Sequence, residues 1–319
     1  MENLLNYVGK GMERKKLMKI AIAGGTGFVG KKLTDFLLDQ NHEVYILTRN
    51  TTYTSHHPNL HYVEWLTATS SPENQLQGLD AMINLAGESL NSGRWTEIRK
   101  KRITESRITA TKEVLRILSS LPKKPEVLLN ASAIGIYGTS ETDTFTEDST
   151  QDGSDFLAKT VIAWEDEAKK ATDLGVRTCF LRFGVVLGED GGALTRMVLP
   201  YHLFIGGTIG SGKQWLSWIH IDDVVKGIDF LLHHTSVHGS VNFTAPQPMQ
   251  MKHFGQTIGA VIHRPHWLPV PGFVLEVLLG EMSILVLKGQ KVLPTKLEEH
   301  GFSFTFKTVE QALSQILKG

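Results

Sequence analysis

The stretch "GGTGFVG", residues 24–30, decides how this sequence folds. It follows an apolar run, "KIAIA" at 19–23, and precedes "KKLTDFLLDQ" at 31–40, whose large apolar residues recur at helical spacing. A buried strand, a glycine-rich turn and an amphipathic helix in this order are typical of the first unit of a dinucleotide-binding α/β domain.

The glycines lie at Gly24, Gly27 and Gly30, a looser spacing than the commonest G-x-G-x-x-G pattern. Glycine lets the backbone turn tightly and approach a pyrophosphate, whose charge is stabilised at the helix N-terminus. A tight turn without any ligand is the alternative. We expect the loop to hold a dinucleotide through Gly24, Gly25, Thr26, Gly27, Phe28, Val29 and Gly30.

The end of the next expected strand, "YILTRN" at 45–50, indicates which dinucleotide binds. An acidic residue about 20 positions after the glycines would bind the ribose diol of NAD. This chain carries Thr48 and Arg49 instead. We therefore predict NADP(H), with Arg49 on the 2′-phosphate and Thr48 adding a hydroxyl. The alternative for the cofactor is NAD(H). The alternative for Arg49 is a solvated charge at the end of a strand.

Short apolar runs and amphipathic stretches keep alternating as far as residue 190. This rhythm predicts an α/β fold, a Rossmann-like doubly wound parallel sheet with helices on both faces. We expect strands at 19–23, 42–49, 61–65, 80–87, 126–138, 176–184 and 239–245, and helices at 30–40, 94–119 and 156–175.

The irregular second half predicts a smaller C-terminal substrate lobe. We assign 18–188 to the nucleotide-binding domain, with 216–245 returning to it, and 189–215 and 246–319 to the lobe. Residues 1–17 have no place in the sheet and are expected to be a disordered tail or an extension before a start at Met18.

Lys plus Arg and Asp plus Glu number 33 each, so the formal net charge is zero. This balance argues against nucleic-acid and membrane-surface proteins, which rely on excess positive charge. The longest apolar run, "FVLEVLLGEMSILVL", carries two glutamates, and no secretory signal is visible. We expect a cytoplasmic monomer or homodimer without a metal, acting on a small molecule.

Several motifs are similar to those of extended short-chain dehydrogenases/reductases, in the same order. They are "GGTGFVG", "INLAG", "SAIGIYG", "FLRFGVVLG" and "WIHIDDVV". From Met18 onward the sequence resembles more closely the atypical YfcH-like group, the epimerase family proteins. The more specific motifs include "NLAGESLNSGRWTEIRKKRITESRITAT", "GGTIGSGKQWLSWIHIDD" and "GEMSILVLKGQKVLPTKLEEHGF".

The resemblance implies positions for further cofactor contacts. "INLAG" would lie under the cofactor, and the residues directly after it would lie near the cofactor or substrate. For Arg107, in the helix expected at 94–119, the alternative is a charge on the helix surface. The implied contacts are Leu85, Ala86, Gly87, Glu88, Arg94 and Arg107.

The residues that usually carry the chemistry are missing. Extended members use a Ser or Thr, a Tyr that exchanges a proton with the substrate oxygen, and a Lys four residues after that Tyr. No tyrosine here has a lysine four residues later. Alignment on Glu165 places Leu157 and Val161 at the Tyr and Lys positions, and Ala133 takes the hydroxyl position.

Two hypotheses remain. The first is a nucleoside-sugar-epimerase-like oxidoreductase or isomerase with a non-standard proton donor, for which Ser132, Tyr137 and Glu88 are the candidates. The second is a non-catalytic NADP(H)-binding sensor, regulatory or interaction protein.

Aromatic density in the second lobe favours the enzyme, because a sensor needs no elaborate pocket. Trp215, Trp218, His220, His266 and Trp267 could line a cleft or simply fill the core. We expect "HIDD" at 220–223 to be a structural corner between the lobes.

Overall fold

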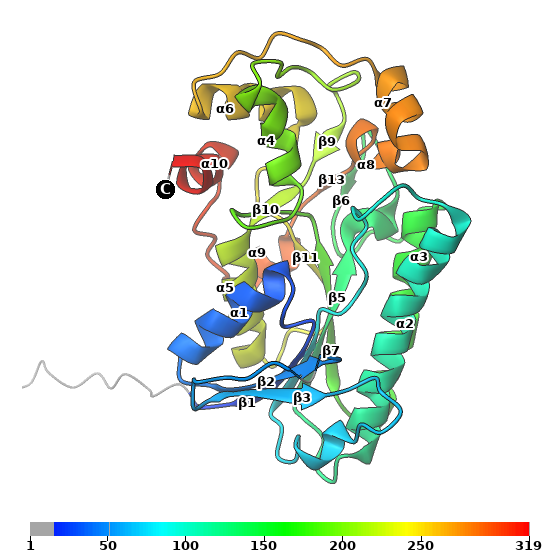
Figure 1. The fold of residues 1–319 in the computed structure, drawn as a ribbon, viewed down its shortest axis with the longest axis vertical. Helices are drawn as coiled ribbons and strands as arrows, with labels where there is room; N and C mark the ends of the chain where they lie inside the picture. Colours follow the sequence, from blue (N-terminus) through cyan, green and yellow to red (C-terminus); the bar gives the residue numbers. More distant parts are fainter. Residues whose placement is uncertain (1–15, 51, 319) are drawn as a thin grey trace, which may run out of the picture.

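The computed structural model describes residues 16–50 and 52–318. A parallel sheet of seven strands forms its centre, in the order β11-β7-β5-β4-β1-β2-β3 (Figure 1). The predicted doubly wound α/β fold is confirmed. The strands are β1 (Lys19–Ala23), β2 (Glu43–Thr48), β3 (Leu60–Glu64), β4 (Ala81–Asn84), β5 (Val127–Ala133), β7 (Arg177–Phe183) and β11 (Gly239–Phe243).

Helices cover both faces of the sheet. Helices α1 (Phe28–Asp39) and α5 (Ile221–His233) pack against each other on one face, and α2 (Glu97–Ser120) packs against α3 (Phe156–Lys169) on the other. Side chains alternate along a strand, so β1 serves both cores. Ile20 and Ile22 face α1 and α5, whereas neighbouring alanines of β1 face α2.

Several predicted elements differ from the structure in their bounds. The strand expected at 126–138 ends at Ala133, and a 3₁₀ turn, η2 (Ile134–Tyr137), follows it. The strand expected at 80–87 ends at Asn84, whose buried side-chain amide donates to Thr111 and Asn130, and the chain then leaves the sheet beside the glycine loop. The helix expected at 156–175 is divided, because a 3₁₀ turn, η3 (Lys170–Leu174), continues it to Gly175 at φ +76°.

A smaller lobe packs on the carboxyl ends of the strands. Its core is shared by helices α4 (Leu194–His202), α6 (Met251–Val261) and α10 (Val309–Lys318). Short strand pairs join it to the sheet domain. The remaining elements are β6 (Thr144–Phe145), β8 (Val185–Leu187), β9 (Trp215–Leu216), β10 (Trp218–His220), β12 (Met249–Gln250), β13 (Lys291–Val292), α7 (Gly272–Leu279), α8 (Ile284–Leu287), α9 (Thr295–Glu299), η1 (Pro72–Asn74), η2 (Ile134–Tyr137) and η4 (Gly280–Ser283).

The last part of the chain crosses between the two parts of the molecule. β11 pairs with β7 as the edge strand, so the segment after residue 216 returns to the sheet. α9 packs against β11, and Leu297 and Phe304 belong to the core of the sheet domain. The exact residue boundaries of the two expected lobes stay a prediction.

The N-terminal prediction for 1–17 falls mostly outside the described residues. Of the described part, Lys16 pairs with Asp80 at 2.9 Å, while Leu17 is exposed.

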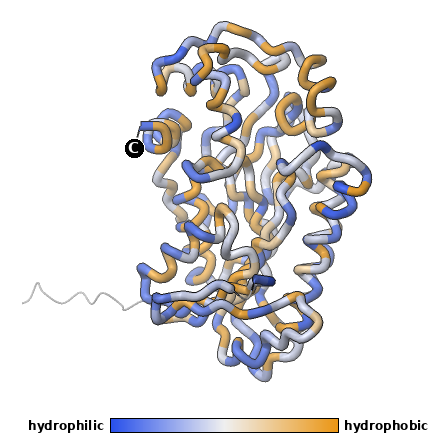
Figure 2. The backbone as a smooth tube through the Cα atoms, in the orientation of Figure 1, coloured by the Kyte–Doolittle hydropathy of each residue, from blue (hydrophilic) through white to orange (hydrophobic). Residues whose placement is uncertain are grey.

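Helix α7 is strongly hydrophobic and yet lies on the outside (Figure 2). Phe273, Val277 and Leu278 are exposed there. No helix among the described residues is long and apolar enough to cross a membrane.

The "HIDD" corner ties the start of α5 to the chain between α9 and α10. Asp223, fully buried, accepts hydrogen bonds from the backbone N–H groups of Thr305 and Phe306 at 2.8 and 2.9 Å. The ring of His220 stacks on Phe306 at 3.8 Å and caps α5 by accepting from the N–H of Asp222. These contacts give the corner the structural role expected of it.

We predict that Asp223→Ala lowers the free energy of unfolding by about 2 kcal/mol, because it leaves two N–H groups without their charged acceptor. Urea denaturation monitored by circular dichroism measures the loss. Asp222→Ala is the matched control, since it breaks a half-exposed pair with Lys32 and a 3.8 Å contact with His220, and it should cost less than about 1 kcal/mol. Equal losses in the two variants would contradict the assigned role.

Candidate functional site

The site lies where the strand order reverses, at the carboxyl ends of β1 and β4. Gly24 turns the chain out of β1 with φ +81°, and a Cβ on it would lie 2.8 Å from the main chain of Leu85. Helix α1 begins with no side-chain cap and no acidic residue in its first turn. Its N-terminal N–H groups and positive dipole end are therefore available to an anion.

Two cavities meet at this loop and share Gly24, Gly27, Leu85 and Gly87 in their walls. We name them by the strand ends that they border. The β2 cavity, about 850 Å³, lies between the glycine loop, the end of β2 and α2. The β5 cavity, about 550 Å³, extends past the end of β5 toward α3 and the smaller lobe. A dinucleotide crossing the loop would place one half in each.

Thr48 and Arg49 line the β2 cavity, as do Ala86 and Glu88. Thr48 is buried, and its hydroxyl accepts from the N–H of Asn50, whereas Arg49 is exposed. Glu88 is paired with two arginines of α2 that lie within 3.0 Å, Arg99 and Arg102. Glu88, a candidate proton donor, thus lies in the wall of the β2 cavity.

Arg107 is a half-buried cation on the wall between the glycine loop and α3. Its guanidinium donates to the carbonyl oxygens of Glu88 and Ile103 and lies over the ring of Trp164. Burial lowers the pKa of Arg107 to about 10, so it stays charged at neutral pH. Arg107 lines the β5 cavity beside Gly87, so it is not a freely solvated charge on the helix surface.

Arg94 and Gly25 do not lie where the implied cofactor contacts would put them. Arg94 donates to the carbonyl of Val277 at 3.2 Å and so holds α7, outside the walls of both cavities. Gly25 is buried with its Cα against the side chain of Ile46 and forms the turn without lining a cavity. The other predicted cofactor residues line one cavity or both.

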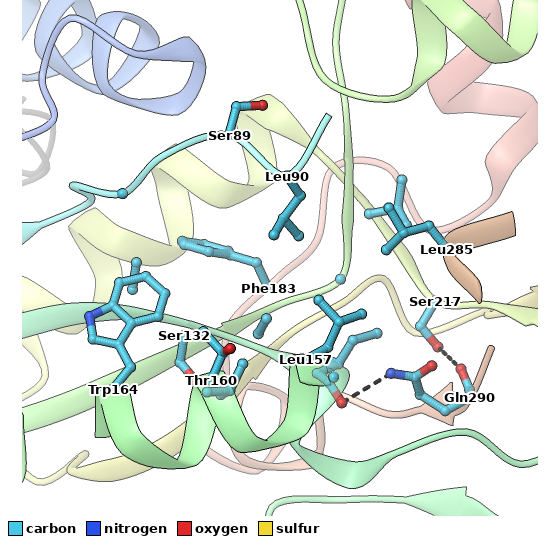
Figure 3. Close-up of a pocket in the computed structure, with 18 of the residues that line it drawn as sticks. Ser89, Leu90, Ser132, Leu157, Thr160, Trp164, Phe183, Ser217, Leu285 and Gln290 are labelled. Carbon is cyan, nitrogen blue, oxygen red and sulfur yellow. Dashed lines mark hydrogen bonds between the residues drawn. The ribbon is translucent and has the colours of Figure 1, made fainter. Parts of the chain in front are cut away.

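Ser132 lies on the floor of the β5 cavity at the end of β5 (Figure 3). Its hydroxyl donates to the carboxylate of Glu165 on α3. Arg182 on β7 holds both oxygens of that carboxylate at 2.8 Å. A serine hydroxyl backed by a fixed carboxylate is an arrangement that can orient a substrate oxygen or pass on its proton.

Tyr137 belongs to the same polar network but is not in the cavity wall. Its hydroxyl donates to Asn242 at 2.8 Å and receives a bond from Arg182 at 2.9 Å, and the residue is 1% exposed. Burial raises the pKa of its phenol, opposite to the shift that helps a tyrosine exchange a proton at neutral pH. These contacts give Tyr137 a structural position.

The three apolar residues that the sequence alignment puts at the usual catalytic positions lie in one cavity. Leu157, Val161 and Ala133 all line the β5 cavity. No tyrosine lines this cavity in the part of the chain that the structure describes. Nor do three or more His, Cys, Asp or Glu side chains gather there as a metal site.

Of the aromatic residues expected in a cleft, Trp215 alone lines the β5 cavity. Trp218 is buried in the core of the lobe, Trp267 is exposed, and His266 bonds to Tyr201 and Thr208. Sequence reasoning assigned no role to several wall residues, although most of them lie within the quoted motifs, because a motif does not show which of its side chains face a cavity. They are Ser89, Leu90, Thr160, Trp164, Phe183, Ser217, Leu285 and Gln290 (Figure 3).

Known proteins share this chain's sequence over nearly its full length. The NAD dependent epimerase/dehydratase family model matches residues 20–243, and a domain of unknown function, DUF1731, matches 270–316. The chain is 51% identical to the epimerase family protein YfhF of Bacillus subtilis, over 94% of this chain and 98% of that one. It is 42% identical to the chloroplastic epimerase family protein SDR39U1 homolog of Arabidopsis thaliana, over 96% and 88%.

Solved structures agree with these matches. The human epimerase family protein SDR39U1 (isoform 2) with NADPH superposes with a TM-score of 0.85 at 32% identity, covering 95% of this chain and 100% of that one. UDP-glucuronic acid 4-epimerase from Bacillus cereus, with NAD, superposes at 0.74 and 15% identity and shows the fold alone. Because the family model spans well over half of the residues, the chain belongs to the NAD dependent epimerase/dehydratase family.

Proposed function

We propose that this protein is an NADP(H)-dependent oxidoreductase or epimerase in which Ser132, backed by Glu165, contacts the reacting oxygen. The proposal depends above all on one observation. Of the three candidate proton donors, Ser132 alone lies in the β5 cavity, beyond the glycine loop. Glu88 lies in the β2 cavity and Tyr137 lines neither.

The residues present fit a dinucleotide phosphate. The uncapped N-terminus of α1 and the close turn at Gly24 suit the pyrophosphate, and Arg49 at the end of β2 suits a 2′-phosphate. The human relative with NADPH, at 32% identity, supports NADP(H) over NAD(H). When bound, the nicotinamide supplies or accepts a hydride.

Ser132 would then handle the proton. Its own hydrogen is donated to Glu165, so its oxygen can accept a hydrogen bond from a substrate hydroxyl. As a substrate alcohol loses its hydride, its proton passes to Ser132 and the serine proton passes to Glu165. The reverse path returns the proton when a carbonyl is reduced. A carbon centre would be inverted if the carbonyl compound turned and presented its opposite face before the hydride returned.

The cofactor assignment predicts the behaviour of Arg49→Ala. The variant should lose most of the preference for NADPH over NADH, because a charge-assisted hydrogen bond of roughly 1.5–3 kcal/mol corresponds to about 10- to 150-fold in affinity. Fluorescence titration with both reduced nucleotides measures the two dissociation constants.

Arg102→Ala is the matched control, because Arg102 lines the same cavity but is paired with Glu88. If Arg102→Ala lost the preference for NADPH and Arg49→Ala kept it, Arg102 rather than Arg49 would bind the 2′-phosphate. An unchanged preference in both variants would remove the basis for NADP(H).

The proton path predicts that Ser132→Ala lowers kcat by roughly 10²- to 10⁴-fold, the usual contribution of a positioned proton-transfer group. The affinity for NADPH should not change, because the serine lies beyond the glycine loop. Consumption of NADPH with a panel of aldehydes and ketones provides the rate, and titration provides the affinity.

Tyr137→Phe distinguishes the two hydroxyls. It should lower the free energy of unfolding by about 1–3 kcal/mol, since Arg182 and Asn242 lose a buried partner, with little effect on kcat. If Tyr137→Phe lowered kcat and Ser132→Ala did not, Tyr137 would be the proton donor. Selective NADPH binding without turnover of any carbonyl would favour the non-catalytic sensor.

A further inference from the structure

We infer that the β5 cavity takes a small, uncharged and largely apolar alcohol or carbonyl compound rather than a nucleoside diphosphate sugar. The inference rests on the proposed function, because the same cavity must also admit the nicotinamide end of the cofactor. Three features of the cavity carry it: the chemistry of its walls, the position of its charges and the satisfaction of its polar groups.

The walls around Ser132 are mostly apolar. They come from five separate parts of the chain: the loop after β4, helix α3, the end of β7, strand β9 and helix α8 (Figure 3). The side chains that face inward are Leu90, Leu157, Val161, Phe183, Trp215 and Leu285. Such walls favour an apolar ligand by about 25 cal/mol for each Å² removed from water.

The charged residues of the cavity are badly placed for a diphosphate. Arg107, Asp155 and Lys288 are the charged side chains among its described walls. Arg107 lies beside Gly87, on the cofactor side, and already donates to two carbonyl oxygens. Lys288 is exposed. A second diphosphate would therefore meet no buried cation of its own.

A helix N-terminus could replace a cation, but the one at this cavity is already occupied. Asp155 caps α3 by accepting from the N–H of Ala158 at 2.9 Å. Its carboxylate places a negative charge where an anion would otherwise bind. A phosphate approaching α3 would be repelled.

Most polar groups of the wall are bonded within the protein. Ser217 donates to the carbonyl of Gln290 at 2.9 Å, and the side-chain amide of Gln290 donates to the carbonyl of Ile134 at 3.0 Å. The hydroxyl of Thr160 pairs with Thr104 at 3.0 Å. Ser132 remains as the polar contact on the floor, which suits a ligand with one reacting oxygen on an apolar body.

The test is ligand binding to the NADPH-loaded protein, measured by ligand-observed NMR. The probes are cyclohexanone, 2-octanone, acetophenone and UDP-glucose. At least one ketone should bind about tenfold more tightly than UDP-glucose. Burial of an apolar ligand lowers the free energy of binding, whereas a diphosphate loses its hydration without gaining a paired cation. Tighter binding of UDP-glucose than of every ketone, or no binding of any ketone, would overturn the inference.

Leu157→Asp assigns the binding to this cavity. An acidic residue in the first turn of a helix is compatible with folding. Here it would lower the affinity for the ketone about tenfold and leave the affinity for NADPH unchanged. Lys159→Asp is the matched control, since Lys159 lies in the same turn but is exposed and outside the cavity. Equal affinities of the two variants would place the ketone elsewhere and contradict the inference.

The titration with NADPH is done first, because it separates a failure of the proposed function from a failure of this inference. A protein that binds no NADPH would refute the proposed function and the inference together. A protein that binds NADPH but no ketone would refute the inference alone.

Discussion

The buried ion pair between Arg182 and Glu165 joins the elements that build the substrate side of the site. It connects β7 to α3, and through Ser132 and Tyr137 it also fixes β5 and the turn that follows. Tyr137 extends the network to Asn242 on β11. A buried pair of this kind is costly to desolvate and tolerates the loss of neither partner, so it specifies a geometry more than it adds stability.

The same network lies directly behind the floor of the β5 cavity. Leu157 and Val161 of α3 line this cavity, and the Glu165 carboxylate behind its floor is paired with Arg182. Under the proposed function, the reacting oxygen would therefore meet a serine between mostly apolar walls. Arg107, Asp155 and Lys288 are the charged side chains among the described walls of this cavity.

The charges of the β2 cavity follow from the strand ends. Arg49 lies at the end of β2, and the pairs between Glu88 and α2 line the same cavity. Solvent reaches this cavity, so charged groups there incur little desolvation cost. In the β5 cavity, the half-buried Arg107 is satisfied by main-chain carbonyls.

The sequence by itself determined the sheet, the glycine loop, the end of β2 and the absence of a Tyr-x-x-x-Lys pair, because these depend on local periodicity and on fixed spacings along the chain. It also set Leu157 and Val161 in register with Glu165 on one helix. Only the tertiary structure decided that Ser132 faces the β5 cavity, that Tyr137 does not, that Arg94 holds α7 and that Arg107 lies beside Gly87. Each of these depends on contacts between residues 19 to 183 positions apart, such as Ser132 with Glu165 and Arg94 with Val277, which no local pattern encodes.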